Sequence, residues 1–174
     1  VYFWNLIYNH TLMKKILLTL AIVLSAYISQ AQEFGAAIHA GYLTEIDAIG
    51  AGADLTYDFN EKWGLTASGT FASAEGGGIR NKWFALDLNG RYNVIDKLYV
   101  LAGGEYLSLT VKNLGIGGGV IGDESSVTDT EFGINLGTGY RYNIVDNVSV
   151  FAEVKYVVLE AGYVHARAGL HFGF

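Results

Sequence analysis

Three histidines, His39, His165 and His171, are the side chains of this sequence best suited to chemistry near neutral pH. Imidazole is the commonest transition-metal ligand and also serves as a general base. In an extended strand, His165 and His171 would lie about 20 Å apart at ~3.3 Å per residue, so they cannot share one ion. His39 belongs to a distant segment and could approach one of them. We favour structural roles for all three and expect neither a metal site nor a cofactor.

A serine with a base and an orienting carboxylate would be the second possible reactive arrangement. Nucleophilic catalysis needs these groups within hydrogen-bonding reach of one another. No serine lies on the segment of His165 and His171, but Ser149 and Glu153 share one face of the preceding segment. Polar residues at even spacing are expected on any polar strand face, so we predict that the chain is not an enzyme.

The histidines at 165 and 171 belong to a larger set of charged residues that recur at even spacings. The set comprises Asp54, Asp58, Asp87, Arg91, Glu105, Arg141, Glu153, Lys155, His165, Arg167 and His171. Acidic and basic members are nearly balanced, and buried charges must be paired. We therefore interpret the set as a network of ion pairs and hydrogen bonds that fills a lumen. The alternative is a narrow porin-like channel, in which ions or small solutes pass along the same groups.

The elements that position this set are strands, because apolar residues alternate with its members. Alternation is clearest in residues 163–174, where Val164, Ala166 and Ala168 face one way while His165 and Arg167 face the other. It recurs in residues 34–42, 49–59, 63–71, 84–92, 98–106, 132–142 and 148–158. Such strands match the ~9–11 tilted residues that cross a bilayer, and strands in lipid must close into a ring. We predict an all-β fold, an eight-stranded antiparallel up-and-down transmembrane β-barrel.

Connections of two kinds separate the strands. Short turn signals lie at 57–63, 92–98 and 142–148, and longer connections at 43–48, 73–82, 111–130 and 160–162. We place the short turns on the periplasmic side and the longer connections outside. Aromatic residues near both sets of strand ends are expected to form two girdles at the membrane interfaces. The girdle residues are Phe59, Trp63, Tyr92, Tyr142 and Phe172 toward the turns, and Tyr42, Phe71, Trp83, Tyr106, Phe132 and Tyr156 toward the loops.

The first 31 residues are not expected to belong to the barrel. Residues 13–31 have the form of a signal peptide, with Lys14 and Lys15 before a short apolar run and small residues at the cleavage site. Residues 1–12 precede the only methionine, and we interpret them as an over-extended N-terminus. The barrel is therefore predicted to occupy residues 32–174.

Composition excludes several classes of protein. The chain has 11 basic and 17 acidic residues, a formal net charge of −6, which argues against nucleic acid as a partner. It has no cysteine and no proline, so no disulfide stabilises it and no proline interrupts a strand. In the third outer connection, Asp123, Glu124 and Asp129 could hold divalent cations, but a solvated loop is the simpler interpretation. The glycines at 115–119 lack the lysine and helix of a phosphate-binding loop.

The alternating strands and the aromatic ending His171-Phe-Gly-Phe174 resemble the small eight-stranded outer-membrane barrels, the OmpA/OmpX-like group of porin-family proteins. The resemblance implies the outer membrane of a Gram-negative bacterium. It also implies that Phe172 and Phe174 form the signal recognised by the barrel assembly machinery, and that outer-membrane lipid and lipopolysaccharide surround the barrel. On this basis we expect a monomer with a structural role or a surface-contact role through its outer loops.

Overall fold

The structure of the chain, a computed structural model, describes residues 33–76, 79–113 and 126–174. The predicted signal peptide at 13–31 and the residues before it lie outside the described residues. The same is true of the glycines at 115–119 and of Asp123 and Glu124. In the part of the chain that is described, no helix is long and apolar enough to cross a membrane.

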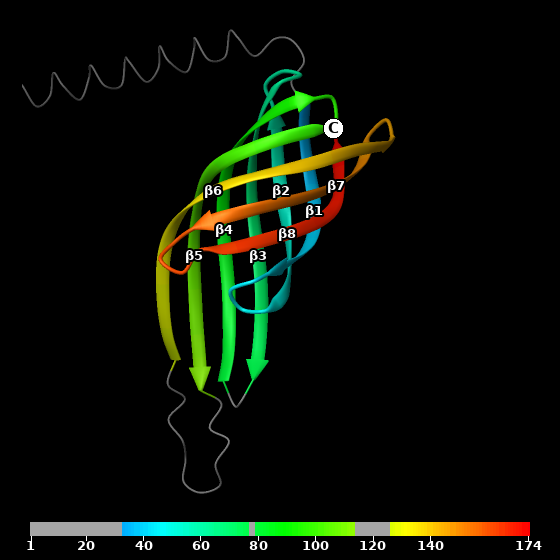
Figure 1. Ribbon diagram of the computed structural model, residues 1–174. Helices are drawn as coiled ribbons and strands as arrows, with labels where there is room; N and C mark the ends of the chain where they lie inside the picture. Colours follow the sequence, from blue (N-terminus) through cyan, green and yellow to red (C-terminus); the bar gives the residue numbers. More distant parts are fainter. Residues whose placement is uncertain (1–32, 77–78, 114–125) are drawn as a thin grey trace, which may run out of the picture. The chain divides into compact units, whose positions relative to one another are not determined.

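Eight antiparallel strands form one closed barrel, which confirms the predicted fold (Figure 1). They are β1 (Glu33–Leu43), β2 (Ala48–Asp58), β3 (Trp63–Gly76), β4 (Ile79–Ile95), β5 (Leu98–Asn113), β6 (Ser126–Val145), β7 (Val148–Val158) and β8 (Tyr163–Gly173). Each strand pairs with its neighbours in sequence, and β1 pairs with β8 from Gly35–Gly173 to Leu43–His165 to close the ring. Closure satisfies the backbone groups that an open sheet would leave unpaired.

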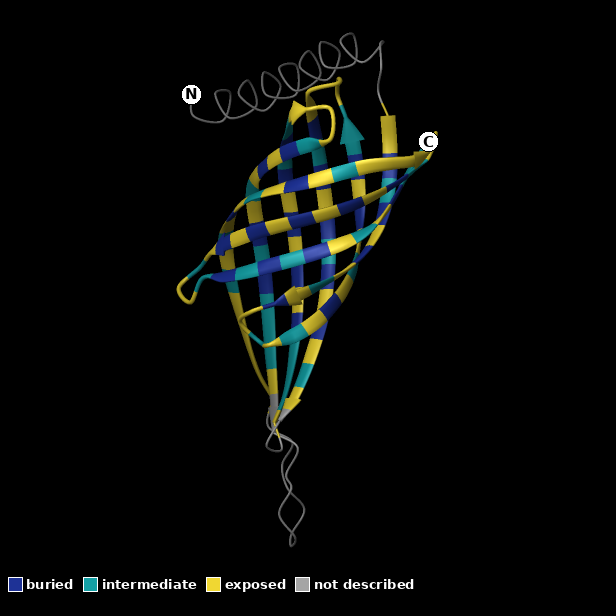
Figure 2. Cartoon of the chain, turned by 45° about the vertical axis from the view of Figure 1, so that its right-hand side comes forward, coloured by how far each residue is buried: buried dark blue, intermediate teal, exposed yellow. Residues whose placement is uncertain are grey.

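Burial alternates along most of the barrel wall, as the banded pattern in Figure 2 shows, although residues 126–130 at the start of β6 are all exposed. In β7, every residue from Ser149 to Val157 that faces the lumen is buried, and the residues between them are exposed. Exposed outward residues include Phe132, which is 81% exposed, and Ile49, which is 75% exposed. The barrel is thus apolar outside and polar inside, the reverse of a soluble protein and the arrangement that lipid requires.

The three short connections lie at one end of the barrel, here called the turn end. Asp96 and Lys97 separate β4 from β5, and Asp146 and Asn147 separate β6 from β7. Both hairpins contain a register shift beside the turn. In the remaining short turn, the side-chain oxygen of Asn60 accepts hydrogen bonds from two backbone N–H groups at 2.9 Å. These closed turns fix the register of the strands that carry the charged residues.

Two of the outer connections at the opposite end, the loop end, are much shorter than predicted. The segment 73–82 was expected to be a loop, but β3 and β4 pair through it as far as Gly76 and Ile79. Likewise, β5 and β6 remain paired as far as Lys112 and Ser126. Backbone pairing does not depend on a lipid-facing pattern, so polar strands can continue into water. Figure 1 shows β3 to β6 extending beyond the β1–β2 and β7–β8 connections.

An apolar cluster closes the lumen near the loop end. Its buried members are Leu43, Ala72, Trp83, Ala85, Leu107, Val157 and Tyr163. The assignment of Trp83 to the lipid-facing girdle was therefore wrong: the side chain is 1% exposed and its ring packs edge-on against Tyr163 at 5.0 Å. The physical reason is strand alternation, because Phe84 faces lipid and its neighbour must face inward.

The two tryptophans of the barrel should report these opposite environments. In single-tryptophan variants of the chain from residue 32 onward, Trp63 in W83F should be strongly quenched by spin-labelled lipids, because it is exposed on the outward face. Trp83 in W63F should be quenched weakly by the same lipids. Fluorescence of the folded barrels in vesicles checks this, and equal quenching would show that Trp83 faces lipid.

Candidate functional site

The structure places every residue of the charged set on an inward strand face. Nine of the eleven are buried, and Asp58 and Arg141 are partly exposed at the turn end. The lumen therefore holds several layers of polar side chains, which we describe from the middle outward. We call this assembly the lumen network.

Arg167 is the centre of the lumen network. Its Nε donates to Glu153 Oε1 at 2.7 Å and its Nη1 donates to Asp54 Oδ1 at 2.9 Å. Tyr99 donates to the second oxygen of Glu153 at 2.9 Å, and His39 lies 3.2 Å from Asp54. These residues come from β8, β7, β2, β5 and β1, so the bonds cross the whole lumen. Charge-assisted bonds of this kind are about twice as strong as neutral ones.

A second layer lies toward the loop end and centres on Lys155. Its ammonium group donates to Asp87 and, at 3.0 Å, to Glu105. Tyr163 donates to the other oxygen of Glu105, and the amide of Asn135 donates to Asp87 at 2.7 Å. One cation thus bridges two carboxylates, Tyr163 occupies the second oxygen of Glu105, and Asn135 bonds the same oxygen of Asp87 as Lys155.

A third layer lies toward the turn end. Arg91 donates to Asp58 at 2.6 Å, and Arg141 lies 3.6 Å from the second oxygen of the same carboxylate. Nearby, His171 Nε2 and Thr56 Oγ1 are hydrogen-bonded at 2.8 Å. Two arginines share one carboxylate here, so this layer has an excess of positive charge. That excess balances the excess of negative charge in the second layer, where one lysine lies between two carboxylates.

Inward-facing glycines make room for the largest side chains of the network. A Cβ added at Gly139 would overlap the ring of Tyr99, and one added at Gly52 would overlap the ring of His39. A residue with any side chain at these positions would displace a member of the central layer. The glycines on polar strand faces therefore have a packing role.

The network leaves little space for solvent. The cavity in the central layer, beside Asp54, Glu153 and Arg167, has a volume of about 10 Å³. A single water needs roughly 10–15 Å³ measured this way, so the centre holds one water at most. A larger cavity of about 190 Å³ lies at the turn end, where Arg141 and His171 form part of its lining.

The groups that suggested nucleophilic catalysis are near one another but are bonded elsewhere. Ser149 and His171 are paired across β7 and β8. However, Ser149 donates to Asn143 at 2.8 Å, and the Nε2 atom of His171 is bonded to Thr56. Glu153 is held by Arg167 and Tyr99. Among the described residues, the serine hydroxyl thus bonds an amide oxygen and not an imidazole.

The histidine rings that could approach one another do so without forming a metal site. The rings of His39 and His165 are 6.2 Å apart between centroids. Among the described residues, no group of three or more histidine, cysteine or acidic side chains is arranged to hold a metal ion. His39 instead bonds Thr70 at 3.2 Å and contacts Asp54.

Other predicted girdle residues lie on outward strand faces, and those toward the loop end include Tyr106 and Phe132, which lie well inside β5 and β6. Trp63 packs on Tyr92 at 4.8 Å toward the turn end, and Tyr106 packs on Phe132 at 5.2 Å toward the loop end. Tyr142 and Tyr156 are also exposed. At the chain end, Phe172 faces outward and Phe174 is exposed, and their role as an assembly signal stays a prediction.

Sequence reasoning missed three residues that complete the lumen network. They are Tyr99, Asn135 and Tyr163, all of which bond to acidic members of the network. Strict alternation could have found them, because each stands an even number of residues from a charged residue on the same strand. Selecting the inward residues by charge alone leaves out neutral hydrogen-bond donors such as tyrosine and asparagine.

Comparisons with known proteins agree with this geometry. A family model described as outer membrane protein beta-barrel domain matches residues 16–173. Among solved structures, the chain is similar to a major outer membrane protein of Thermus thermophilus, with 13% identity and a TM-score of 0.71 over 83% of this chain and 100% of the other. A search of curated proteins finds no significant match.

Two further structures share the fold. The N-terminal barrel domain of Pseudomonas aeruginosa OprF has 18% identity and a TM-score of 0.59, with 82% of this chain and 97% of that one covered. Neisserial surface protein A has 13% identity and a TM-score of 0.56 over the same shares. At such identities the likeness concerns the fold alone.

Proposed function

Because this chain belongs to the outer membrane protein beta-barrel domain family and resides in the bacterial outer membrane, we propose that it is a closed barrel without enzymatic activity. Its role is structural support of the membrane or surface contact through the connections at its loop end. It acts as a monomer, and outer-membrane lipid and lipopolysaccharide surround its apolar outer face. The turn end faces the periplasm.

The observation that carries this proposal is the filled centre of the lumen. Arg167 joins Asp54 and Glu153 across the barrel, and the remaining cavity there has a volume of only about 10 Å³. Removing one partner of a buried ion pair costs ~3–5 kcal/mol. If spontaneous opening costs as much, the open state is populated in less than ~1% of molecules.

A narrow channel for ions or small solutes is the second candidate. It is supported by the successive layers of charged groups in the lumen and by the cavity of about 190 Å³ at the turn end. A solute entering there would meet Arg141 and then the central layer. Conduction would require Arg167 to release both of its carboxylate partners.

Single-channel recording distinguishes the two candidates. The mature chain, refolded and selected by a heat-sensitive shift on gels, should leave planar bilayers silent at moderate voltage and salt. A large porin added to the same bilayer provides the positive control. Discrete and repeated conductance steps from the folded chain would favour the channel and contradict the closed barrel.

A further inference from the structure

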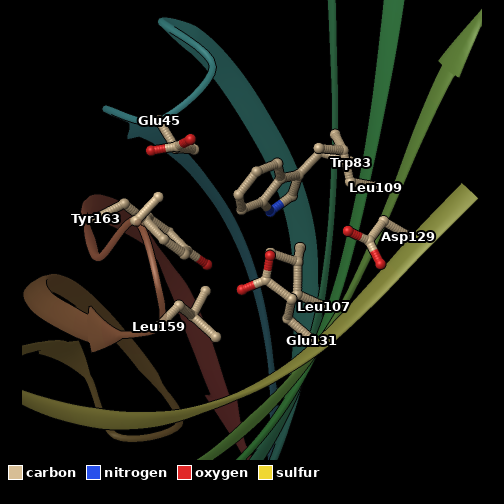
Figure 3. A pocket seen from close by; sticks show the side chains of 9 residues that line it. Glu45, Trp83, Leu107, Leu109, Asp129, Glu131, Leu159 and Tyr163 are labelled. Atoms are coloured by element: carbon tan, nitrogen blue, oxygen red, sulfur yellow. The ribbon is translucent and has the colours of Figure 1, made fainter.

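A small cup at the loop end differs in chemistry from the lumen network beneath it (Figure 3). Its floor is formed by Trp83, Leu107 and Tyr163, and its edge carries three carboxylates, from Glu45, Asp129 and Glu131. The cavity has a volume of about 40 Å³. The floor belongs to the apolar cluster that closes the lumen, so the cup opens away from the network.

The cup has a buried donor without a partner. Trp83 is 1% exposed, and its Nε1 has no hydrogen-bond partner among the residues that the structure describes. In Figure 3 the indole nitrogen lies on the edge of the ring that faces Tyr163 and Glu131. An unsatisfied buried donor costs ~1–3 kcal/mol, and a ligand that offered an acceptor would recover part of that cost.

The cup also has an excess of negative charge. None of its three carboxylates forms an ion pair with any residue whose side chain the structure describes, whereas every acidic group in the lumen network has a cationic neighbour. The three do not converge as metal ligands would, in the described parts of the chain. Each carboxylate can instead accept a charge-assisted hydrogen bond from an organic cation that enters the cup.

The walls between floor and edge are apolar. Leu109 from β5 and Leu159 from the β7–β8 connection are half-buried and pack against the cluster. From the floor outward, the cup therefore presents a hydrogen-bond donor, then hydrocarbon, then negative charge. Each layer recognises a different part of one small molecule.

We propose that this cup binds a small organic cation from outside the cell: a primary ammonium group on a short apolar stem that ends in a hydrogen-bond acceptor. The acceptor meets the Trp83 N–H, the stem lies between Leu109 and Leu159, and the ammonium donates to Glu131 and its neighbours. The site specifies a class of ligand for the proposed surface-contact function. It rests on that function only for the position of the loop end outside the cell.

The test uses the W63F chain from residue 32 onward, folded in uncharged detergent, so that Trp83 is the single tryptophan. The probe is 3-methoxypropylammonium, whose binding is followed through Trp83 fluorescence. Pentylammonium keeps the size and charge but lacks the acceptor, and 1-methoxybutane keeps the acceptor but lacks the charge. We expect saturable binding of the probe, with affinity roughly 10-fold lower for each of the other two molecules.

Two substitutions in the W63F chain separate the cup from a general attraction of cations to an acidic surface. E131Q should weaken probe binding about 10-fold, because the ammonium then donates to a neutral amide oxygen in place of a carboxylate. E160Q removes an exposed carboxylate from the same end of the barrel without touching the cup, and it should change affinity less than about 2-fold. Both variants are expected to keep the heat-sensitive gel shift of the folded barrel.

The proposal is overturned if the probe gives no saturable signal, if 1-methoxybutane binds as well as the probe, or if E160Q weakens binding as much as E131Q. Should E131Q fail to fold, the comparison of the three molecules still decides. The outcome is independent of conductance. A conducting barrel that binds the probe would contradict the closed lumen alone, and a silent barrel that does not bind would contradict the cup alone.

Discussion

Replacing Arg167 with methionine should lower the free energy of unfolding by ~3–5 kcal/mol, because two carboxylates would lose their cation in the middle of the barrel. Arg167 is 5% exposed and bonds both Asp54 and Glu153. Methionine preserves most of the side-chain length, so loss of packing contributes less than loss of charge. Urea unfolding of the barrel in lipid vesicles, followed by tryptophan fluorescence, measures the change.

The matched control is R80M, which removes an arginine from an ion pair at the surface. Arg80 and its partner Glu75 have side chains 38% and 55% exposed. Surface pairs of this kind contribute less than ~1 kcal/mol, so R80M should unfold close to the unchanged barrel. An equally small effect of R167M would mean that the central layer does not stabilise the fold.

Replacing Lys155 with methionine should also cost ~3–5 kcal/mol, and neutralising its partners should recover most of that loss. Lys155 bonds Asp87 and Glu105, and all three side chains are almost fully buried. K155M alone leaves two carboxylates close together without a cation. The triple variant D87N/E105Q/K155M removes the repulsion while keeping acceptors for Asn135 and Tyr163.

The same urea titrations decide this prediction. The comparison of single and triple variants separates charge pairing from packing, because both contain the same methionine. If the triple variant is as unstable as K155M, then the shape of the lysine side chain matters and its charge does not. The barrel must remain foldable in each case, which the heat-sensitive gel shift checks before unfolding is measured.

Period-two alternation was sufficient to predict the architecture and to select the charged lumen residues. Each strand had only two possible faces, and hydrocarbon had to lie outside. Asp54, Arg167 and the other members of the set therefore faced inward regardless of exact strand ends. The same rule applied strictly places Trp83 inside, whereas the expectation of an aromatic girdle places it outside.

Alternation could not predict the partners within the lumen. Which cation meets which carboxylate depends on the stagger of neighbouring strands, and pairs such as Arg167 with Asp54 join strands that are not adjacent. The extension of β3 to β6 beyond the other strands was missed because water, unlike lipid, imposes no side-chain pattern. The cup could not be predicted either, because its lining comes from several strands and two connections that are far apart in the sequence.

Bulk solvent should not reach the middle of the folded lumen, and a single cysteine can report this. Ser68 is buried beside Arg167, and the chain has no cysteine of its own. In the folded barrel, S68C should react with a small charged methanethiosulfonate at least about 100-fold more slowly than A161C at the exposed loop end, because reaction must wait for local opening. Comparable rates in barrels that retain the heat-sensitive gel shift would contradict a closed lumen.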